Sequence, residues 1–285
     1  MMADVEALSA FPTRFAAADG RHAARDWLRA RLATAGAAVR EQRFPLRVGT
    51  GETEQANLWA VLPGTDPAAP LLVLAAHWDS VNEGWRGETP SLEDPDSPAP
   101  GAGDNASGVA VLLESARLLA ARPPRRGVVV LFAAAEEMGQ AGSRAWLAGP
   151  GRELPVGWAL NVDQVGRSRS RPRALQLFTR GPGRDLALRL RDLGRAACPG
   201  VRGWRLHLDD RLGKSDHGPF LDAGLAAVSL SEGPGYYPWE DQGTGDVAAK
   251  VDPDLLAAAA RLVTATARDP GLPPPAGARP PATPR

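Results

Sequence analysis

Three runs of small and branched apolar residues constrain the fold of this chain more than any other feature. The runs are LLVLAAH (71–77), GVVVLFAAAEE (127–137) and WALNVDQ (158–164). None of them alternates between apolar and polar residues, which is typical of strands covered on both faces. Residues 105–121 and 142–148, between these runs, are predicted to be helices. This order of strands and helices predicts a layered α/β fold with a largely parallel central sheet and right-handed crossovers.

Further elements extend the pattern on both sides. Residues 21–36 have the spacing of an amphipathic helix that ends at Gly36. Two extended-looking stretches follow at 38–48 and 57–64, and no internal repeat is found. Later strands are expected at 174–180 and 226–232, and later helices at 184–197 and 253–267.

A Pro-rich stretch marks the end of the folded region. The last 17 residues, 269–285, contain seven prolines and few side chains whose burial could offset the entropy of ordering. The chain is 44% hydrophobic, which is enough to bury one substantial core. We therefore predict one folded domain over residues 1–268 and a disordered or polyproline-like tail over residues 269–285.

The charge balance and the composition exclude several classes of partner and of structural site. The 33 basic and 33 acidic residues cancel, so the overall charge gives no attraction to nucleic acid or to an anionic membrane. No apolar run approaches the roughly 18 residues of a membrane span, and the N-terminus lacks a basic-then-apolar secretion signal. The single cysteine, Cys198, excludes an internal disulfide and a four-thiolate zinc site. We expect a cytoplasmic protein with a small partner; a start codon further upstream could instead direct it outside the cell.

Ligand-type side chains stand at the ends of the three central strands. His77 ends the first run, Glu136 and Glu137 end the second, and Asp163 ends the third. Because ligands of open α/β sheets collect outside the carboxyl ends of the strands, these side chains are expected to meet at one edge. Each also has an ordinary explanation: a hydrogen-bonded histidine, a solvent-facing glutamate pair and a turn-forming aspartate.

Two local spacings favour a metal site at this edge. Asp79 lies two residues after His77, so in an extended chain its carboxylate can accept the free ring N–H of a metal-bound imidazole. The adjacent Glu136 and Glu137 can share a pocket only if a cation offsets their repulsion or one of them is protonated.

The stretch GAGDNASG (101–108) raises the question of what Asp104 holds. Asp and Asn are preferred helix N-caps, and a helix is expected from Asn105, so capping is the ordinary reading. The pattern also fits G-x-G-x-x-A, but the preceding strand ends about 25 residues earlier, and Asp104 would repel a pyrophosphate. The third reading is a metal ligand.

The third reading gains support when all the candidates are combined. His217, in KSDHGPF, adds an imidazole from another segment, so four separate elements each supply a ligand near one sheet edge. Oxygen and imidazole ligands without thiolate suit zinc or a similar divalent ion at a catalytic centre. The sequence therefore predicts a catalytic metal site.

Five motifs, in order, make the chain similar to a known family, the di-zinc exopeptidases typified by bacterial leucyl-type aminopeptidases. That family also includes glutamate carboxypeptidases and glutaminyl cyclases. The motifs are VLAAHWDSV, GAGDNASGVAVLLESARLL, VVVLFAAAEEMGQAGSRAWL, NVDQVG and SDHGPF. The resemblance covers most of residues 11–267 and implies a three-layer α/β/α sandwich with a central, mostly parallel mixed sheet. Residues 1–268 are accordingly expected to form a single zinc-exopeptidase-like catalytic domain.

Transferred motif by motif, the resemblance implies a role for each candidate. Asp104 would bridge two zinc ions per chain. The remaining metal ligands would be His77 and Asp163 at one ion and Glu137 and His217 at the other. Glu136 would be the general base on a water or hydroxide between the metals, and Asp79 would orient His77.

One departure from the family pattern concerns the substrate pocket. Where the family shows Tyr-His, a short polar stretch and Asp, this chain has YYPWEDQGTGD, with an apparent insertion before Asp246. Tyr236, Tyr237 and Trp239 could line a pocket for an apolar side chain or could pack the loop.

The resemblance implies an aminopeptidase that hydrolyses the N-terminal bond of a peptide with a free N-terminus. The motifs resemble the peptidase branch more than the glutaminyl cyclases, which use one functional zinc on the same scaffold. A cyclase-like acyltransferase, a carboxypeptidase, a dipeptidase and a metal-free binding module on a peptidase fold are the alternatives. The oligomeric state is left open.

Overall fold

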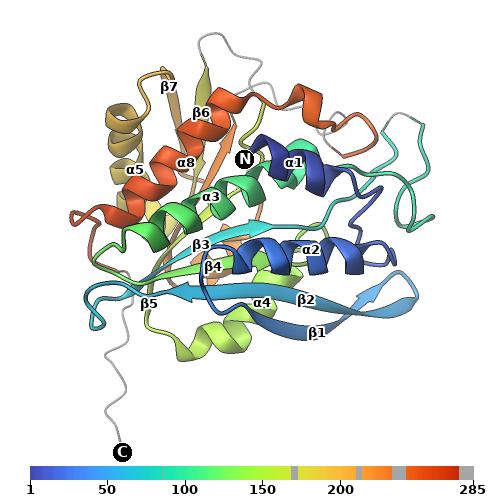
Figure 1. Ribbon diagram of the computed structural model, residues 1–285, viewed down its shortest axis with the longest axis horizontal. Helices are drawn as coiled ribbons and strands as arrows, with labels where there is room; N and C mark the ends of the chain where they lie inside the picture. Colours follow the sequence, from blue (N-terminus) through green and yellow to red (C-terminus); the bar gives the residue numbers. More distant parts are fainter. Residues whose placement is uncertain (86, 168–172, 210–213, 233–241, 276–285) are drawn as a thin grey trace, which may run out of the picture.

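An eight-stranded mixed sheet forms the centre of the protein (Figure 1). The computed structural model describes residues 1–85, 87–167, 173–209, 214–232 and 242–275. The strand order across the sheet is β1-β2-β4-β3-β5-β8-β6-β7. The strands are Arg40–Val48 (β1), Gly51–Leu62 (β2), Leu71–His77 (β3), Val128–Ala133 (β4), Val156–Val162 (β5), Ala174–Phe178 (β6), Gly203–His207 (β7) and Ala226–Glu232 (β8).

The middle of the sheet is parallel and its flanks are mixed. β3 pairs in parallel with β4 and β5, and β5 pairs in parallel with β8. β2 joins β1 and β4 in antiparallel fashion, and β6 is antiparallel to β8 but parallel to β7. The parallel centre confirms the prediction from the three apolar runs. The carboxyl ends of β3, β4 and β5 therefore lie at one edge of the sheet.

Helices cover both faces of the sheet and complete the three layers. The helices are Met2–Ser9 (α1), Arg21–Ala33 (α2), Ser107–Ala121 (α3), Ala141–Ala148 (α4), Arg184–Ala197 (α5), His217–Asp222 (α6) and Pro253–Arg268 (α8). Buried side chains of α1, α2, α3, α5 and α8 share one core with one face of the sheet, whereas those of α4 and α6 share a second core with the other face. The α/β/α sandwich implied by the family resemblance is thus confirmed.

The absence of alternation in the central strands follows from these two cores. In β3, Leu72 and Leu74 face the larger core, while Val73 and Ala75 face the smaller one, and all four are 0% exposed. Burying one Leu or Val side chain contributes about 1.5–3 kcal/mol relative to leaving it exposed. An uninterrupted apolar run is therefore what a strand between two helical layers requires.

The helix predicted from Asn105 starts later than expected. Residues Ala102–Ala106 form a π-helical turn (η1), inside which Asp104 and Asn105 have non-helical backbone angles, and α3 begins at Ser107. Asp104 and Asn105 are joined by a cis peptide bond. This irregular turn lies beside the carboxyl end of β3 and carries the residue whose role the sequence left open.

The first part of the Pro-rich stretch packs against the sheet. Leu272 is 9% exposed and belongs to the larger core. The indole Nε1 of Trp158 donates a 2.9 Å hydrogen bond to the carbonyl of Pro273, and the guanidinium of Arg126 lies 4.7 Å from the Trp158 ring centroid. Residues 276–285 of that stretch lie outside the described residues.

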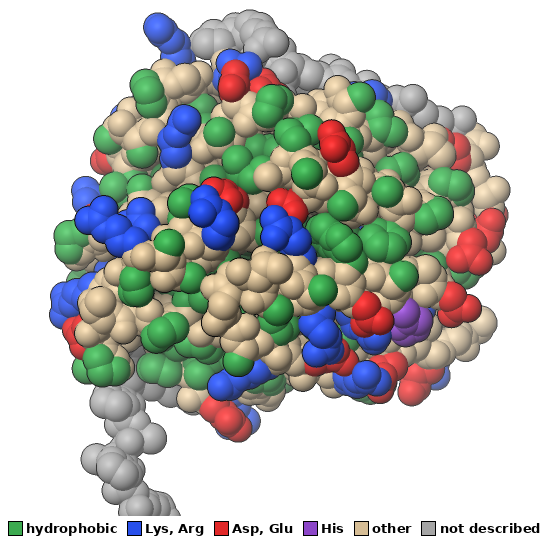
Figure 2. Space-filling model, viewed as in Figure 1, with side chains coloured by type: hydrophobic (Ala, Val, Ile, Leu, Met, Phe, Trp, Pro, Cys, Tyr) green, Lys and Arg blue, Asp and Glu red, His purple; other side chains and the backbone are tan. Residues whose placement is uncertain are grey.

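Basic and acidic side chains are interspersed over the helical face drawn in Figure 2. On these helices Arg31 pairs with Asp4, and Arg117 with Glu114. Such mixing creates no large field of one sign on this face. Within the part of the chain that the structure describes, no helix has the length and apolar character needed to cross a bilayer.

Candidate metal centre

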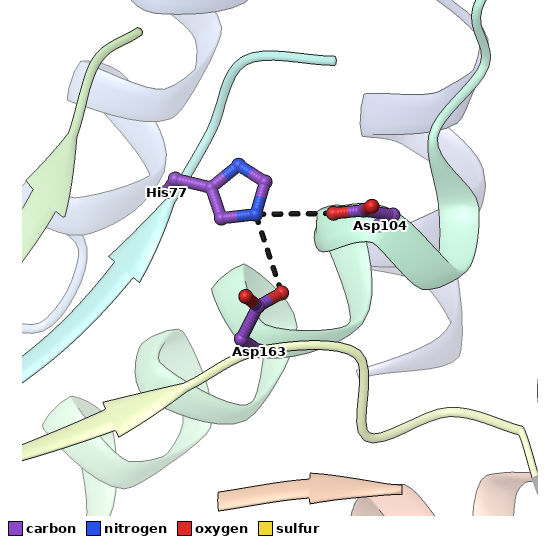
Figure 3. A group of neighbouring side chains, drawn as sticks. All are labelled: His77, Asp104 and Asp163. Atoms are coloured by element: carbon purple, nitrogen blue, oxygen red, sulfur yellow. Dashed lines mark hydrogen bonds and ion pairs between the residues drawn. The ribbon is translucent and has the colours of Figure 1, made fainter. Parts of the chain in front are cut away.

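His77, Asp104 and Asp163 come together from three separate elements (Figure 3). His77 ends β3, Asp104 lies in the η1 turn, and Asp163 directly follows β5. The Nε2 atom of His77 lies 3.1 Å from Asp104 Oδ1 and 3.2 Å from Asp163 Oδ1. His77 is 1% exposed and Asp104 is 3% exposed. One ligand atom from each of the three residues lies within 4.8 Å of the others, which is close enough for a shared metal ion.

A second group joins the same histidine to the glutamate pair after β4. Ligand atoms of His77, Glu136 and Glu137 also lie within 4.8 Å of one another. Glu136 accepts a 3.1 Å hydrogen bond from the side chain of Gln140, and Glu137 Oε2 accepts one of 3.3 Å from Gln242. The other oxygen of Glu137, Oε1, is buried without a hydrogen-bond partner among the described residues.

Asp79 ties the end of β3 to the glutamate pair. Its Oδ1 accepts a 3.0 Å hydrogen bond from the backbone N–H of Glu136, and its Oδ2 accepts one of 3.2 Å from the N–H of Glu137. The same Oδ1 is 3.5 Å from His77 Nδ1. Asp79 is 2% exposed. Its carboxylate is thus placed to orient both the imidazole and the turn that carries the two glutamates.

His217 is close enough for its charge to act on Asp163, but it is in neither group of converging ligand atoms found among the described residues. It is the first residue of α6 and is 3% exposed. The neighbouring Ser215 donates a 2.6 Å hydrogen bond to Asp163 Oδ2, which fixes this segment against the end of β5. Burial alone would raise the pKa of Asp163, but the positive charges of His77 and His217 and the Ser215 hydroxyl outweigh it and lower this pKa.

The side chain of Asn105, and not that of Asp104, hydrogen-bonds to the backbone at the start of α3. The Asn105 side-chain oxygen accepts a 2.9 Å hydrogen bond from the N–H of Gly108, and its amide donates one of 2.9 Å to the carbonyl of Val162. The Asp104 carboxylate instead accepts a hydrogen bond from the Gln164 side chain and lies 3.1 Å from His77 Nε2. The capping function suggested by the sequence is therefore carried out by the next residue, which leaves the Asp104 carboxylate available as a ligand.

The electrostatics of the cluster fit a divalent cation. Burial raises the pKa of Glu136 and of Glu137 well above the ordinary glutamate value, because a carboxylate loses hydration there and faces other carboxylates. Burial likewise raises the pKa of Asp104, although His77 opposes the shift, and it raises that of Asp216 to about 7.

The same carboxylates also shift the pKa of His77. Burial lowers its pKa, but Asp163 and Asp104 raise it more strongly, and the net direction is well upward. The cluster therefore carries excess negative charge, which its own side chains can offset only by binding protons. Carboxylate oxygens and imidazole without thiolate are a ligand set that zinc accepts, and a bound cation would remove the charge imbalance.

Two amide side chains reach the cluster without having been singled out by the sequence. Gln164 Nε2 donates a 2.5 Å hydrogen bond to Asp104 Oδ2, and Gln242 reaches Glu137. Each follows a residue or motif that the sequence did mark, Asp163 in one case and YYPWED in the other. A glutamine does not by itself indicate a metal site, so the only signal in the sequence was that each glutamine follows a residue or motif already marked.

The expected pocket residues Tyr236, Tyr237 and Trp239 lie outside the described residues, and their role remains a prediction. Gln242 and Asp246, which follow them, are described. The backbone carbonyl of Gln242 accepts a 3.0 Å hydrogen bond from the N–H of Glu83. This segment therefore packs against the loop after β3, next to the cluster.

Proteins similar to this chain include probable zinc metalloproteases and solved enzymes of the same fold. A probable zinc metalloprotease from Leptosphaeria maculans is 31% identical over 219 residues, which cover 66% of this chain and 47% of that protein. The chain spans about half the length of the curated relatives it matches.

Two solved structures from Bacteroides thetaiotaomicron share the fold. A leucine aminopeptidase precursor matches with a TM-score of 0.77 and 20% identity, covering 94% of this chain and 95% of that one. A glutaminyl cyclase bound to N-acetylhistamine matches with a TM-score of 0.78 and 20% identity, covering 94% and 96%. At this identity the two likenesses show the fold and do not distinguish the reactions.

The family model of peptidase family M28 matches residues 57–267. This range starts in β2 and ends in α8, so it includes the whole central sheet from β3 to β8 and every residue of the two ligand groups. The chain therefore belongs to peptidase family M28, a family of zinc metallopeptidases.

Proposed function

We propose that this protein is an aminopeptidase that binds two zinc ions and hydrolyses the first peptide bond of a peptide with a free N-terminus. The observation that carries the proposal is the convergence on one imidazole nitrogen. His77 Nε2 lies within 3.2 Å of carboxylate oxygens of Asp104 and Asp163, and its ring also closes a second ligand group with the glutamate pair.

The proposed ligand sets divide the cluster at Asp104. His77 and Asp163 would hold one ion with one oxygen of Asp104, and Glu137 and His217 would hold the other. The buried Glu137 Oε1, which has no hydrogen-bond partner among the described residues, supports a ligand role for that residue. Two bound zinc ions would activate a water molecule for attack and stabilise the negative charge that develops on the peptide carbonyl oxygen.

Glu136 is the proposed proton carrier. The residue is 7% exposed, and Gln140 and the Asp79-bound backbone fix its direction. In this role Glu136 takes a proton from the attacking water and delivers it to the leaving amine, a transfer typically worth about 10² to 10⁴ in rate. Asp79 keeps His77 and the glutamate turn in place while the proton moves.

A glutaminyl cyclase is the second candidate, because a cyclase is among the structures with the same fold. In cyclisation the N-terminal amine of a glutaminyl peptide attacks the side-chain amide carbonyl and ammonia leaves, without consuming water, whereas an aminopeptidase releases a free amino acid. The His77–Asp104–Asp163 group favours the peptidase, because it provides a complete second set of ligands beside the glutamate pair.

A substrate panel with metal analysis separates these reactions. Purified protein is loaded with zinc, its bound zinc is counted, and it is offered unblocked aminoacyl substrates, their N-acetylated counterparts and a peptide with N-terminal glutamine. We expect about two zinc ions per chain, cleavage of unblocked substrates alone, and loss of activity with a chelator. Cyclisation of the glutaminyl peptide without release of amino acid would replace the proposal with the cyclase, and folded protein that binds no zinc would contradict both.

A further inference from the structure

Two buried side chains of opposite charge bind the backbone of the turn that carries Asp104. Arg14 comes from the segment between α1 and α2, and Asp246 comes from the loop before α8. Both side chains are 0% exposed. Neither residue is among the proposed metal ligands.

Arg14 binds main-chain carbonyls on three segments. Its Nη1 donates to the carbonyls of Leu8 (3.1 Å) and Pro100 (2.5 Å), its Nη2 to that of Gly101 (2.9 Å), and its Nε to that of Trp78 (2.7 Å). Trp78 directly follows His77, and Gly101 begins the turn that leads to Asp104. Arg14 therefore connects the end of β3, which carries one proposed ligand, to the turn that carries another.

The charge of Arg14 is balanced at longer range by the acids of the site. Burial lowers the pKa of Arg14 to about 10, and the carboxylates of Asp246, Asp79 and Asp104 oppose this shift. A fully buried guanidinium is stabilised by the carbonyl dipoles that accept its hydrogen bonds and by such surrounding negative charge. The acid-rich site and Arg14 thus support each other.

Asp246 binds the same turn through its backbone N–H groups. Its Oδ1 accepts from Gly103 and its Oδ2 from Asp104, each at 2.8 Å. Its own carbonyl accepts a 3.1 Å hydrogen bond from the N–H of Ala102, and its carboxylate pairs with Arg167. One aspartate thereby holds three consecutive backbone amides of the turn.

The two glycines of GAGD make room for these side chains. A Cβ on Gly101, whose φ is +55°, would lie 2.6 Å from Arg14 Nη2 and 2.4 Å from the carbonyl oxygen of Asp104. A Cβ on Gly103 would lie 3.1 Å from Asp246 Oδ1 and 3.3 Å from Arg167 Nε. Any larger residue at either position would push a charged side chain away from the turn.

We propose that Arg14 and Asp246 are positioning residues that hold the carbonyl of Gly101 and the N–H groups of residues 102–104 and thereby set where the Asp104 carboxylate stands relative to His77. The inference rests on the proposed metal-dependent function, because its consequence is a higher affinity for zinc. Outer groups that orient metal ligands typically contribute about 10- to 100-fold to metal affinity.

Matched glycine substitutions test this positioning with the smallest change. Gly103→Ala adds one methyl group against Asp246, whereas Gly218→Ala adds the same group next to His217, where no atom of the described residues lies within 4 Å. Zinc affinity is measured by competition with a chromophoric chelator, and unfolding of the metal-free proteins is measured by urea titration. We expect weaker zinc binding for Gly103→Ala and unchanged binding for Gly218→Ala, with both metal-free proteins folded.

Changes to the charged residues test the same contacts directly. Asp246→Asn turns an amide N–H group toward the backbone donors, and Arg14→Lys loses the forked geometry while it keeps the charge. We expect each to weaken zinc binding by about 10- to 100-fold. Asp269→Asn is the control, because this buried aspartate binds Arg189 and the N–H of Gly271 at the end of α8, outside the site.

The outcomes distinguish this inference from the proposed function itself. Unmodified protein that binds no zinc contradicts the proposed function. Unmodified protein that binds zinc, together with folded Gly103→Ala and Asp246→Asn proteins of unchanged zinc affinity, overturns the positioning role. If Arg14→Lys does not fold, these two variants still decide the question. A merely structural role lowers the urea midpoint of the metal-free variants without changing the zinc affinity of the folded fraction.

Discussion

Glu136 and Glu137 are neighbours in the chain but have different surroundings. Both backbone N–H groups bind Asp79, yet the side chain of Glu136 contacts Gln140 and that of Glu137 contacts Gln242. Glu137 keeps one buried oxygen without a hydrogen-bond partner among the described residues. These different surroundings fit the different roles proposed for the two residues, Glu137 as a ligand and Glu136 as a proton carrier.

The pair Glu136→Gln and Glu137→Gln tests this division. Glu136→Gln keeps the shape of the side chain but cannot take up a proton, so we expect turnover to fall by about 10² to 10⁴ while bound zinc stays at the unmodified level. Glu137→Gln removes a proposed ligand charge, so we expect loss of zinc from the site. Metal analysis and kcat on the same preparations give both readouts. Unchanged turnover in zinc-loaded Glu136→Gln would contradict its role.

Glu232 offers a pH-dependent test outside the proposed ligands. It ends β8, is 6% exposed, and accepts a 2.5 Å hydrogen bond from the N–H of Arg167. Burial raises the pKa of Glu232 well above the ordinary glutamate value of 4.5. Between the ordinary and the raised pKa the folded state binds more protons than the unfolded state, so this residue makes folding less favourable as the pH rises through that interval.

Glu232→Gln should therefore stabilise the metal-free protein at neutral pH. Its amide oxygen can still accept from Arg167, but it carries no charge to bury. We expect the free energy of unfolding to increase by about 1.4 kcal/mol for each tenfold by which folding raises the proton affinity of Glu232. We expect no increase at a pH below the ordinary glutamate pKa. Urea unfolding from about pH 4 to about pH 8 measures this, with the exposed Glu6→Gln as control. A gain that is the same at every pH would show that charge burial is not its cause.

At the scale of helices and strands, the elements that the sequence could predict were those with a clear apolar pattern. The runs that became β3, β4 and β5 were recognisable because both of their faces are buried, and the long helices were recognisable from their spacing. The extended stretch 57–64 was placed correctly, but its strand, β2, starts at Gly51 and forms a hairpin with β1. β7 was missed, because its five residues are half-exposed or exposed and show no apolar run.

The start of α8 provides a test at this scale. Asp252 is its N-cap, accepting a 2.9 Å hydrogen bond from the N–H of Asp254, and it also pairs with Arg173. We expect Asp252→Ala to lower the free energy of unfolding by about 0.5–2 kcal/mol, as typical for a lost N-cap, without changing zinc affinity. Urea unfolding and chelator competition measure the two quantities. Asp254→Ala, at a largely exposed side chain in the same turn, is the control. Equal losses for the two variants would show that capping is not the cause.

At the scale of the whole molecule, the sequence could predict the ligand types but not the framework that holds them. His77, Asp104 and Asp163 were accessible because each stands in a motif beside a strong element. The contacts of Arg14 with Gly101 and of Asp246 with Gly103 join residues 87 and 143 positions apart. Among 33 basic and 33 acidic residues, no periodicity marks Arg14 and Asp246 as fully buried residues that bind backbone. Only the packed structure identifies them.

The same framework predicts how the molecule as a whole responds to metal. Without a cation, the buried carboxylates at the ends of β3, β4 and β5 repel one another, and this repulsion makes the folded state less stable. A ligand that binds only the folded state stabilises it by about 2.7 kcal/mol at a free concentration 100 times its Kd. We therefore expect a chelator to lower the midpoint of thermal unfolding and added zinc to restore it.

The variants determine whether this stabilisation comes from the proposed centre. Asp104→Asn replaces the shared carboxylate with a neutral amide, so it should relieve some repulsion in the metal-free protein and at the same time weaken zinc binding. Its midpoint in chelator should be equal to or above that of the unmodified protein, whereas the increase on adding zinc should largely disappear. Calorimetry with and without zinc measures both values. If zinc raised the unfolding midpoint of Asp104→Asn as much as that of the unmodified protein, the stabilising metal would be bound at a different site. An ion held at the ends of these strands needs the negative charge that Asp104 supplies.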